Sequence, residues 1–228
     1  MNNIKRNVII TADGSTTIEM DGWNEHYHST HGAISEARHV FIQNGLTYWK
    51  SMNVKAEVCH LLEIGFGTGL NTWLTYIASQ DDDVVMNYTG VEAFPIDSEL
   101  VSKLNFTKQI SSDHASIFKE IHDVKWNERA KLSKLFFLEK MTKKIEEVDD
   151  TNLYDLIYFD AFGARVQPEL WTTSIFRNMF TALKVGGVLV TYSAKGSVRR
   201  AMIDVGFVVE RLPGPIGKRE MLRASKKN

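Results

Sequence analysis

Four acidic residues lie at or near the ends of short apolar runs in the sequence: Glu63, Glu92, Glu139 and Asp160. Each run has the length and composition of a buried β-strand. In an open α/β sheet, ligands bind outside the carboxyl ends of the strands. Taken singly, each acid is better explained as a solvated side chain or a helix cap. Four at predicted strand ends indicate a ligand crevice lined with negative charge.

The first of these runs, residues 58–64, leads into a turn with glycines at positions 65, 67 and 69. Residues 71–79 have a composition compatible with a helix. Glycine allows a positive φ and lets a ligand approach the backbone closely, because it has no Cβ. The spacing is G-x-G-x-G, and Leu70 stands where a dinucleotide fingerprint would have its third glycine.

The charge at the turn indicates the kind of ligand. An anionic Glu63, two residues before Gly65, would repel a pyrophosphate but suits an ammonium or sulfonium group. A cationic nucleoside without phosphates is the description of S-adenosylmethionine. Glu92, at the end of the second predicted strand, would then accept hydrogen bonds from the ribose hydroxyls. The alternative is a glycine turn that binds no ligand.

Asp160 opens the segment DAFGARVQPELW and would border the methyl donor. A carboxylate there could hold an amine, stabilise its developing positive charge and accept its proton. The alternative for Asp160 is an N-cap or a loop acid. Phe162 and Trp171 would give aromatic walls on which a flat ring can stack, although Trp171 is equally well explained by core packing.

Basic residues gather late in the chain. Those that could converge on the crevice are Arg165, Arg199, Arg200, Lys218 and Arg219. Together they would form a phosphate-binding patch, and the alternative is scattered solubilising charge. The net charge of −1 gives no overall attraction to nucleic acid, but a local patch would be sufficient.

The 228 residues, 43% of them hydrophobic, are enough for one packed α/β domain. The single cysteine, Cys59, falls in the first apolar run and predicts a buried side chain without disulfide or zinc chemistry. His26, His28 and His31 share no helix face and have no cysteine beside them, so we expect a solvated or substrate-facing loop and no metal. No apolar run of about eighteen residues and no signal core occur, which predicts a cytoplasmic protein without a membrane partner.

The order of elements predicts the fold class. A hairpin turned at Asp13-Gly14 and a helix from Ser35 to about Gly45 come first. Strands then alternate with helices, and the helix after the second strand has Asp97 as its N-cap and reaches about residue 110. This pattern predicts a mostly parallel sheet with helices on both faces. Residues 207–212 and 220–223 predict an antiparallel edge hairpin at the C-terminus. We expect an N-terminal extension at 1–50 and a core domain at 51–228.

Seven short motifs together resemble one known family. They are GFGTGLN at 65–71, EAFP at 92–95, DAFG at 160–163, PELW at 168–171, KVGG at 184–187, SVRR at 197–200 and GKREM at 217–221. This set is similar to the MnmC-type tRNA methyltransferase domain, and the similarity covers about residues 27–222. The glycine turn is common to many methyltransferases, whereas the last two motifs, in this order, are more specific.

The resemblance implies a Rossmann-like fold, S-adenosylmethionine as donor, and the tRNA anticodon region as substrate. The methyl group would go to the aminomethyl nitrogen on carbon 5 of a wobble uridine, giving 5-methylaminomethyl-2-thiouridine. By position, Glu63, Gly65, Phe66, Gly67 and Gly69 would line the methionine end of the donor, and Tyr27 would close the pocket. Glu92 would hold the ribose, Glu139 would lie beside the adenine, and Asp160 would meet the substrate amine.

The sequence departs from the family pattern at three points. Leu138-Glu139 stand in place of the usual Gly-Asp, and the loop at 163–168 lacks the usual proline-rich sequence. The flavin-dependent oxidoreductase domain of the bifunctional members is not in these 228 residues. The aminomethyl substrate would then come from another enzyme or route.

Three other functions are compatible with the residues. One is a small-molecule N- or O-methyltransferase. Another is an aminopropyl transferase that uses a decarboxylated donor, against which Glu63 is only weak evidence. The third is a non-catalytic module that binds an adenosine ligand or RNA.

Overall fold

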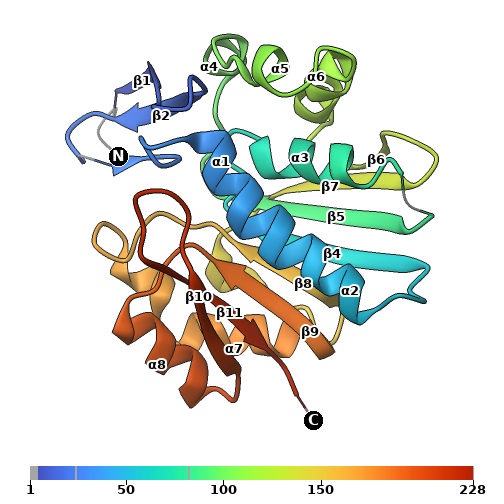
Figure 1. Cartoon of the computed structure of the whole chain (residues 1–228), viewed down its shortest axis with the longest axis vertical. Coiled ribbons are helices and arrows are strands. Elements are labelled where there is room, and N and C mark those ends of the chain that lie inside the picture. Colours follow the sequence, from blue (N-terminus) through green and yellow to red (C-terminus); the bar gives the residue numbers. More distant parts are fainter. Residues whose placement is uncertain (1–4, 24, 82, 228) are drawn as a thin grey trace.

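A computed structural model describes residues 5–23, 25–81 and 83–227. Residues 1–4 of the predicted N-terminal hairpin segment, and Asn24 in the histidine-rich loop, lie outside this description. Its centre is an eight-stranded sheet with the order β10-β11-β9-β8-β4-β5-β7-β6 (Figure 1). The strands are β4 (Val58–Ile64), β5 (Val85–Glu92), β6 (Arg129–Lys131), β7 (Phe136–Thr142), β8 (Tyr154–Phe159), β9 (Leu183–Thr191), β10 (Val208–Pro213) and β11 (Glu220–Ser225).

The five central strands, β9, β8, β4, β5 and β7, are parallel. The predicted C-terminal hairpin is confirmed, because β10 and β11 pair antiparallel and β11 pairs antiparallel with β9. At the other edge, β6 adds a short antiparallel strand that the sequence analysis missed. Its three residues, Arg-Ala-Lys, carry no apolar alternation by which a strand could be recognised.

Helices cover both faces of this sheet, as predicted (Figure 1). One face carries α1 (Ala33–Ala37), the π-helical segment η1 (Arg38–Thr47), α2 (Tyr48–Met52), α3 (Leu70–Ala78) and α6 (Ala115–Asp123). The other face carries α7 (Thr173–Ala182) and α8 (Gly196–Asp204). The expected Rossmann-like α/β class is therefore confirmed. None of the helices in the described ranges has the length and apolar character needed to cross a bilayer.

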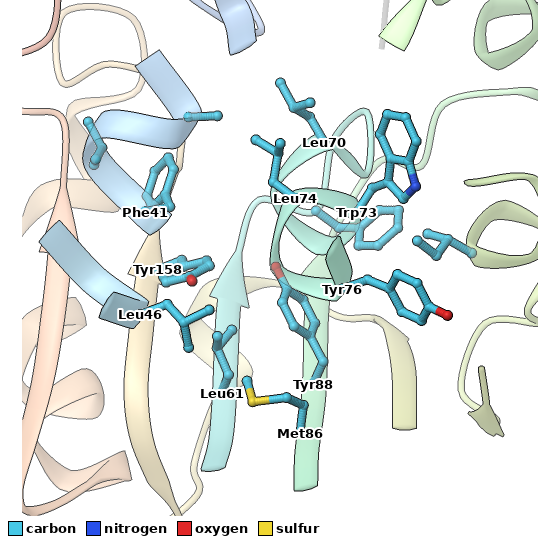
Figure 2. Packing of buried hydrophobic residues seen from close by; sticks show 14 of the residues in the cluster. Phe41, Leu46, Leu61, Leu70, Trp73, Leu74, Tyr76, Met86, Tyr88 and Tyr158 are labelled. Carbon is cyan, nitrogen blue, oxygen red and sulfur yellow. The ribbon is translucent and has the colours of Figure 1, made fainter. Parts of the chain in front are cut away.

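The first helical segment is longer than predicted. It was expected to end near Gly45, but α1, η1 and α2 follow one another without a break over residues 33–52. Gly45 is a packing position and not a helix end, since a Cβ there would lie 3.0 Å from both Tyr158 and Val190 in the sheet. Figure 2 shows Phe41 and Leu46 of this helix beside Tyr158. Glycine therefore lets the helix lie close to the strands.

The predicted helix after β5 is broken into α4 (Ser98–Ser102) and α5 (Phe106–Gln109). Asp97 caps α4 as predicted, accepting from the Leu100 N–H at 2.8 Å. At the break, Asn105 contacts the N-terminal segment: it accepts from the Thr16 N–H at 2.9 Å and donates to the Gly14 carbonyl at 2.9 Å.

The N-terminal segment forms a small antiparallel sheet of β1 (Arg6–Ile10), β2 (Thr16–Met20) and β3 (Glu25–His26). The predicted N-terminal hairpin is confirmed in this sheet, and the bonds to Asn105 hold it in place.

Glu139 was expected at the end of a strand, but β7 continues beyond it to Thr142. Glu139 is consequently a mid-strand residue, opposite Thr89 of β5 and Arg129 of β6. After β7 the chain forms a single 3-10 turn, η2 (Ile145–Glu147).

Replacing Gly45 by alanine should destabilise the fold. Tyr158 and Val190 are fully buried, so the new methyl group can be accommodated only by strain, at a cost of about 1–2 kcal/mol in urea denaturation. Gly196→Ala is the matched control, because its Cβ would meet only the flexible Arg200 side chain. A gain of about 1 kcal/mol for Gly45→Ala, the effect of helix propensity alone, would contradict this packing.

Candidate active site

A cavity of about 1060 Å³ opens at the carboxyl ends of β4, β5 and β8. Its wall comes from the glycine turn, the residues after β5 and β8, the segment after β7 and the small N-terminal sheet. This is the edge of a parallel sheet where ligands bind. Of the predicted site residues, those in the wall are Tyr27, Gly65, Phe66, Gly67, Glu92, Asp160 and Phe162.

The glycine turn lies against the start of the Asp160 loop. Gly65 has a φ of +88°, and a Cβ at this position would be 2.5 Å from the backbone oxygen of Asp160. Gly67 has a φ of +49°, and its Cβ would be 3.2 Å from the Tyr27 ring. Only glycine combines these φ values with such close neighbours. The turn therefore leaves its backbone open to a ligand.

Aromatic rings from two parts of the chain cover this turn. The rings of Tyr27 and Phe162 meet edge to face with centroids 5.0 Å apart, and those of Trp23 and Phe162 do so with centroids 6.2 Å apart. Burial raises the pKa of Tyr27 to about 12, so its hydroxyl stays neutral at physiological pH. Phe66 differs from this pair, because its side chain is 3% exposed and packs against Gly90 and Trp126.

Glu92 bridges the turn and the segment that follows β5. Its Oε2 accepts from the Gly67 N–H at 3.0 Å, and its Oε1 accepts from the Phe94 N–H at 2.9 Å. A carboxylate oxygen can accept more than one hydrogen bond, so both oxygens can still receive a hydroxyl. The carboxylate is thus held rigidly in the cavity wall.

Glu63 is placed differently from the prediction. It is fully buried below the turn and is not part of the cavity wall. Its carboxyl accepts from Asn71 Nδ2 at 2.9 Å, Thr72 Oγ1 at 3.1 Å and the Tyr88 hydroxyl at 2.8 Å. Burial raises its pKa to about 8. The pleat turns this side chain into the sheet–helix interface, so Glu63 supports the turn from below without touching the cavity.

Asp160 follows β8 directly and reaches the cavity from a partly buried position. Its Oδ2 accepts from Asn71 Nδ2 at 2.8 Å. Burial raises the pKa of Asp160 to about 7, an effect that the Asn71 hydrogen bond opposes. Near neutral pH this carboxyl is therefore able both to lose and to accept a proton.

The loop after Asp160 is held by two side chains. The Tyr192 hydroxyl donates to the Ala161 carbonyl at 2.8 Å, and Trp171 Nε1 donates to the Phe162 carbonyl at 2.7 Å. Trp171 is 5% exposed, packs on Phe159 and does not line the cavity, so its predicted role as a substrate wall is wrong and the core-packing alternative holds. It contributes by fixing Phe162.

The predicted basic residues do not line the cavity. Lys218 pairs with Glu36 at 2.6 Å and lies over the Tyr192 ring at 3.8 Å, and Arg165 pairs with Glu25 at 2.7 Å. Arg199 is partly buried in α8, whereas Arg200 and Arg219 are exposed. The cations in the wall are others: Arg6, Lys103, Lys143 and Lys144.

Glu139 also lies outside the cavity wall, because β7 runs three residues beyond it. Residues 143–146 take the place that had been expected for Glu139. Asn71 and Tyr192 also line the cavity but were not predicted as site residues. Asn71 closes the glycine motif and could have been noticed there, while Tyr192 carries no local signal. His26 and His28 of the histidine-rich loop line the cavity as well. No cluster of three or more potential metal ligands occurs in the described part of the chain.

Comparison with known proteins places the chain in a family. The model of a family described as S-adenosyl-L-methionine-dependent methyltransferase matches residues 103–227, more than half of the chain. The chain belongs to this methyltransferase family. Similarity also extends to a protein of Leptospira borgpetersenii named tRNA 5-methylaminomethyl-2-thiouridine biosynthesis bifunctional protein MnmC, with 29% identity over 221 residues. That match covers 91% of this chain and 33% of the relative, so the chain spans about a third of the length of the curated relatives it matches.

Two solved structures share the fold of this methyltransferase. The crystal structure of MnmC2 from Aquifex aeolicus has a TM-score of 0.80 at 24% identity, covering 98% of this chain and 71% of that one. Spermidine synthase from Thermotoga maritima has a TM-score of 0.59 at 13% identity, covering 100% and 71%. Both likenesses concern the fold.

The cavity suits S-adenosylmethionine, the methyl donor of the family. Gly67 leaves open a space that a Cβ would narrow, and Glu92 and Asp160 supply carboxyl groups for hydroxyls and a cation. Asn71 Oδ1 is buried and has no hydrogen-bond partner among the described residues, which leaves one acceptor beside the cavity. We infer that the donor binds along the glycine turn between these groups.

Glu92→Gln should weaken binding of S-adenosylhomocysteine in calorimetry by about ten- to a hundredfold, because an amide offers only one acceptor oxygen to two backbone donors and a hydroxyl. Glu128→Gln, at an exposed residue paired with Lys125, is the matched control and should bind as the wild type does. Wild-type affinity in the Glu92 variant would show that Glu92 does not bind the ligand.

His28 should make stability depend on pH. It bonds to Thr68 Oγ1 at 2.7 Å, and burial lowers its pKa from 6.5 to about 4. Between these values the unfolded chain binds the extra proton, so the folded state loses stability as the pH falls from 6.5 to 4. Relative to His28→Gln, the wild type should lose up to about 3 kcal/mol over this range in urea denaturation. The exposed His31→Gln variant should follow the wild type, and parallel curves for all three proteins would contradict a buried neutral His28.

Proposed function

We propose that this methyltransferase acts on the 5-aminomethyl group of a tRNA wobble uridine and converts 5-aminomethyl-2-thiouridine to 5-methylaminomethyl-2-thiouridine. The observation that carries the proposal is Asp160, a carboxyl with a pKa of about 7 in the wall of the donor cavity. The similarity to the protein named MnmC, over 91% of this chain, supports the choice of substrate. A tRNA substrate would place the enzyme in the cytoplasm.

The bound donor supplies a methyl group that its sulfonium already activates. Asp160 would first hold the protonated alkyl amine by charge and then take its proton, which leaves the nitrogen lone pair free to attack. The proton remains on the carboxyl and passes to solvent after transfer. Tyr192 and Trp171 keep the Asp160 loop in place, so the amine is presented in a fixed position.

The base and the phosphates would be bound at the cavity mouth. Tyr27 and Phe162 are suited to stack on the uracil ring, and Phe94, which is 47% exposed, adds apolar surface beside them. Arg199, Arg200 and Arg219 would contact phosphates outside the cavity, together with Lys144 in the wall. We also retain the division into an extension at 1–50 and a core at 51–228, with the extension covering the donor site.

The direct test is an assay of methyl transfer with tRNA isolated from a strain that lacks the gene for this protein. With purified protein and S-adenosylmethionine, nucleoside mass spectrometry should show the aminomethyl nucleoside gaining one methyl group. Methylation of small amines in place of tRNA would favour the small-molecule alternative. Donor binding without any transfer would favour a non-catalytic module, and either result would overturn the proposal.

Asp160→Asn should lower kcat by about 10²–10⁴-fold, because the amide can neither hold the ammonium nor accept its proton. Affinity for S-adenosylhomocysteine should change little, since the backbone of the turn and Glu92 are unaltered. Asp113→Asn, at an exposed position, is the matched control and should retain wild-type turnover. Unchanged kcat in the Asp160 variant would exclude a role for this carboxyl in transfer.

A further inference from the structure

Two side chains that line the cavity and one buried beneath them form one hydrogen-bonded unit. Asn71 Nδ2 donates to Glu63 Oε1 at 2.9 Å and to Asp160 Oδ2 at 2.8 Å. Asn71 is 2% exposed and Glu63 is fully buried. A single amide on the first turn of α3 therefore joins two carboxyls that come from β4 and from the end of β8.

The groups around this unit supply little net positive charge. Glu63 faces the hydroxyls of Thr72, Tyr88 and, farther away, Tyr158, none of which is a cation. Asp160 faces Glu36 and Lys218, with Tyr192 beside them. Because Lys218 is paired with Glu36 at 2.6 Å, its charge is largely cancelled at Asp160.

Two carboxyls in this position cannot both be ionised easily. Burial raises the pKa of Glu63 to about 8 and that of Asp160 to about 7, and the charge of Asp160 contributes to the rise at Glu63. Carboxyls that interact in this way titrate as a pair. A positive charge in the cavity would stabilise the ionised forms of both and lower both pKa values.

We propose that Glu63, Asn71 and Asp160 act as a charge-responsive unit that holds protons in the free protein and releases part of them to solvent when a cationic ligand enters the cavity. Asn71 is the positioning residue, since it connects the two carboxyls. The unit becomes more negative beside a sulfonium and less negative beside a thioether. It therefore favours the methyl donor over its demethylated product and assists product release. The proposal rests on the proposed function only in the choice of ligand.

Calorimetry without tRNA tests the unit on the intact protein. Titrations with S-adenosylmethionine and S-adenosylhomocysteine at pH 7, in buffers of different ionisation enthalpy, give the number of protons released with each ligand. We expect more protons to be released with the cationic donor than with the neutral product, since the pKa of Asp160 lies near this pH and a positive charge lowers it. Equal release for the two ligands would overturn the proposal.

Variants assign the release to the unit. Asp160→Asn should remove most of the difference between the ligands. Asn71→Ala should move the pH of maximal release upward, because the amide no longer lowers the pKa of Asp160. Asn53→Ala, at the end of α2 and outside the cavity wall, should behave as the wild type does. If Asn71→Ala weakens binding but leaves the pH of release unchanged, Asn71 has only a structural role and the unit does not exist.

The two proposals fail separately. The proton count is measured with donor and product alone, so absence of tRNA methylation would overturn the proposed function and leave the count standing. Efficient tRNA methylation with equal proton release for both ligands would support the proposed function and overturn the charge-responsive unit.

Discussion

The site depends on a backbone contact between two neighbouring parallel strands. Where β4 and β8 end, the Asp160 N–H donates to the Ile64 carbonyl at 2.9 Å, and Gly65 turns away with no Cβ to separate the two chains. This contact fixes the distance from the glycine turn to Asp160. Asn71 then reaches Asp160 from the helix that follows the turn. The main chain at Asp160 is therefore placed by strand geometry, and its carboxyl is oriented by Asn71.

The cavity wall carries charges of both signs. Glu92 and Asp160 line it together with Arg6, Lys103, Lys143 and Lys144, whereas Glu63 is buried and does not line it. Two of these cations form ion pairs, Lys103 with Glu99 and Lys143 with Asp149. A cationic ligand and a polyanionic partner can thus both find groups of opposite charge at the same opening.

The sequence predicted the features that depend on local pattern. Glu92 and Asp160 were found because parallel strands end at one edge of the sheet, and the glycine turn and both hairpins followed from turn chemistry. Features that depend on tertiary packing were missed. Gly45 has the appearance of a helix end until Tyr158 and Val190 are seen against it. Glu63 was assigned to the wrong side because the direction of a side chain at a strand end depends on the pleat, and Glu139 because β7 extends through polar residues.

The part of the cavity wall that comes from β1–β3 and Tyr27 is held by residues much later in the sequence. Asn105 bonds to Thr16 of this segment, Phe162 packs on Tyr27, and Lys218 pairs with Glu36. Because these contacts join positions so far apart, the early segment cannot complete them on the ribosome until residues up to 218 have emerged. The cavity should therefore acquire its full wall only late in biosynthesis.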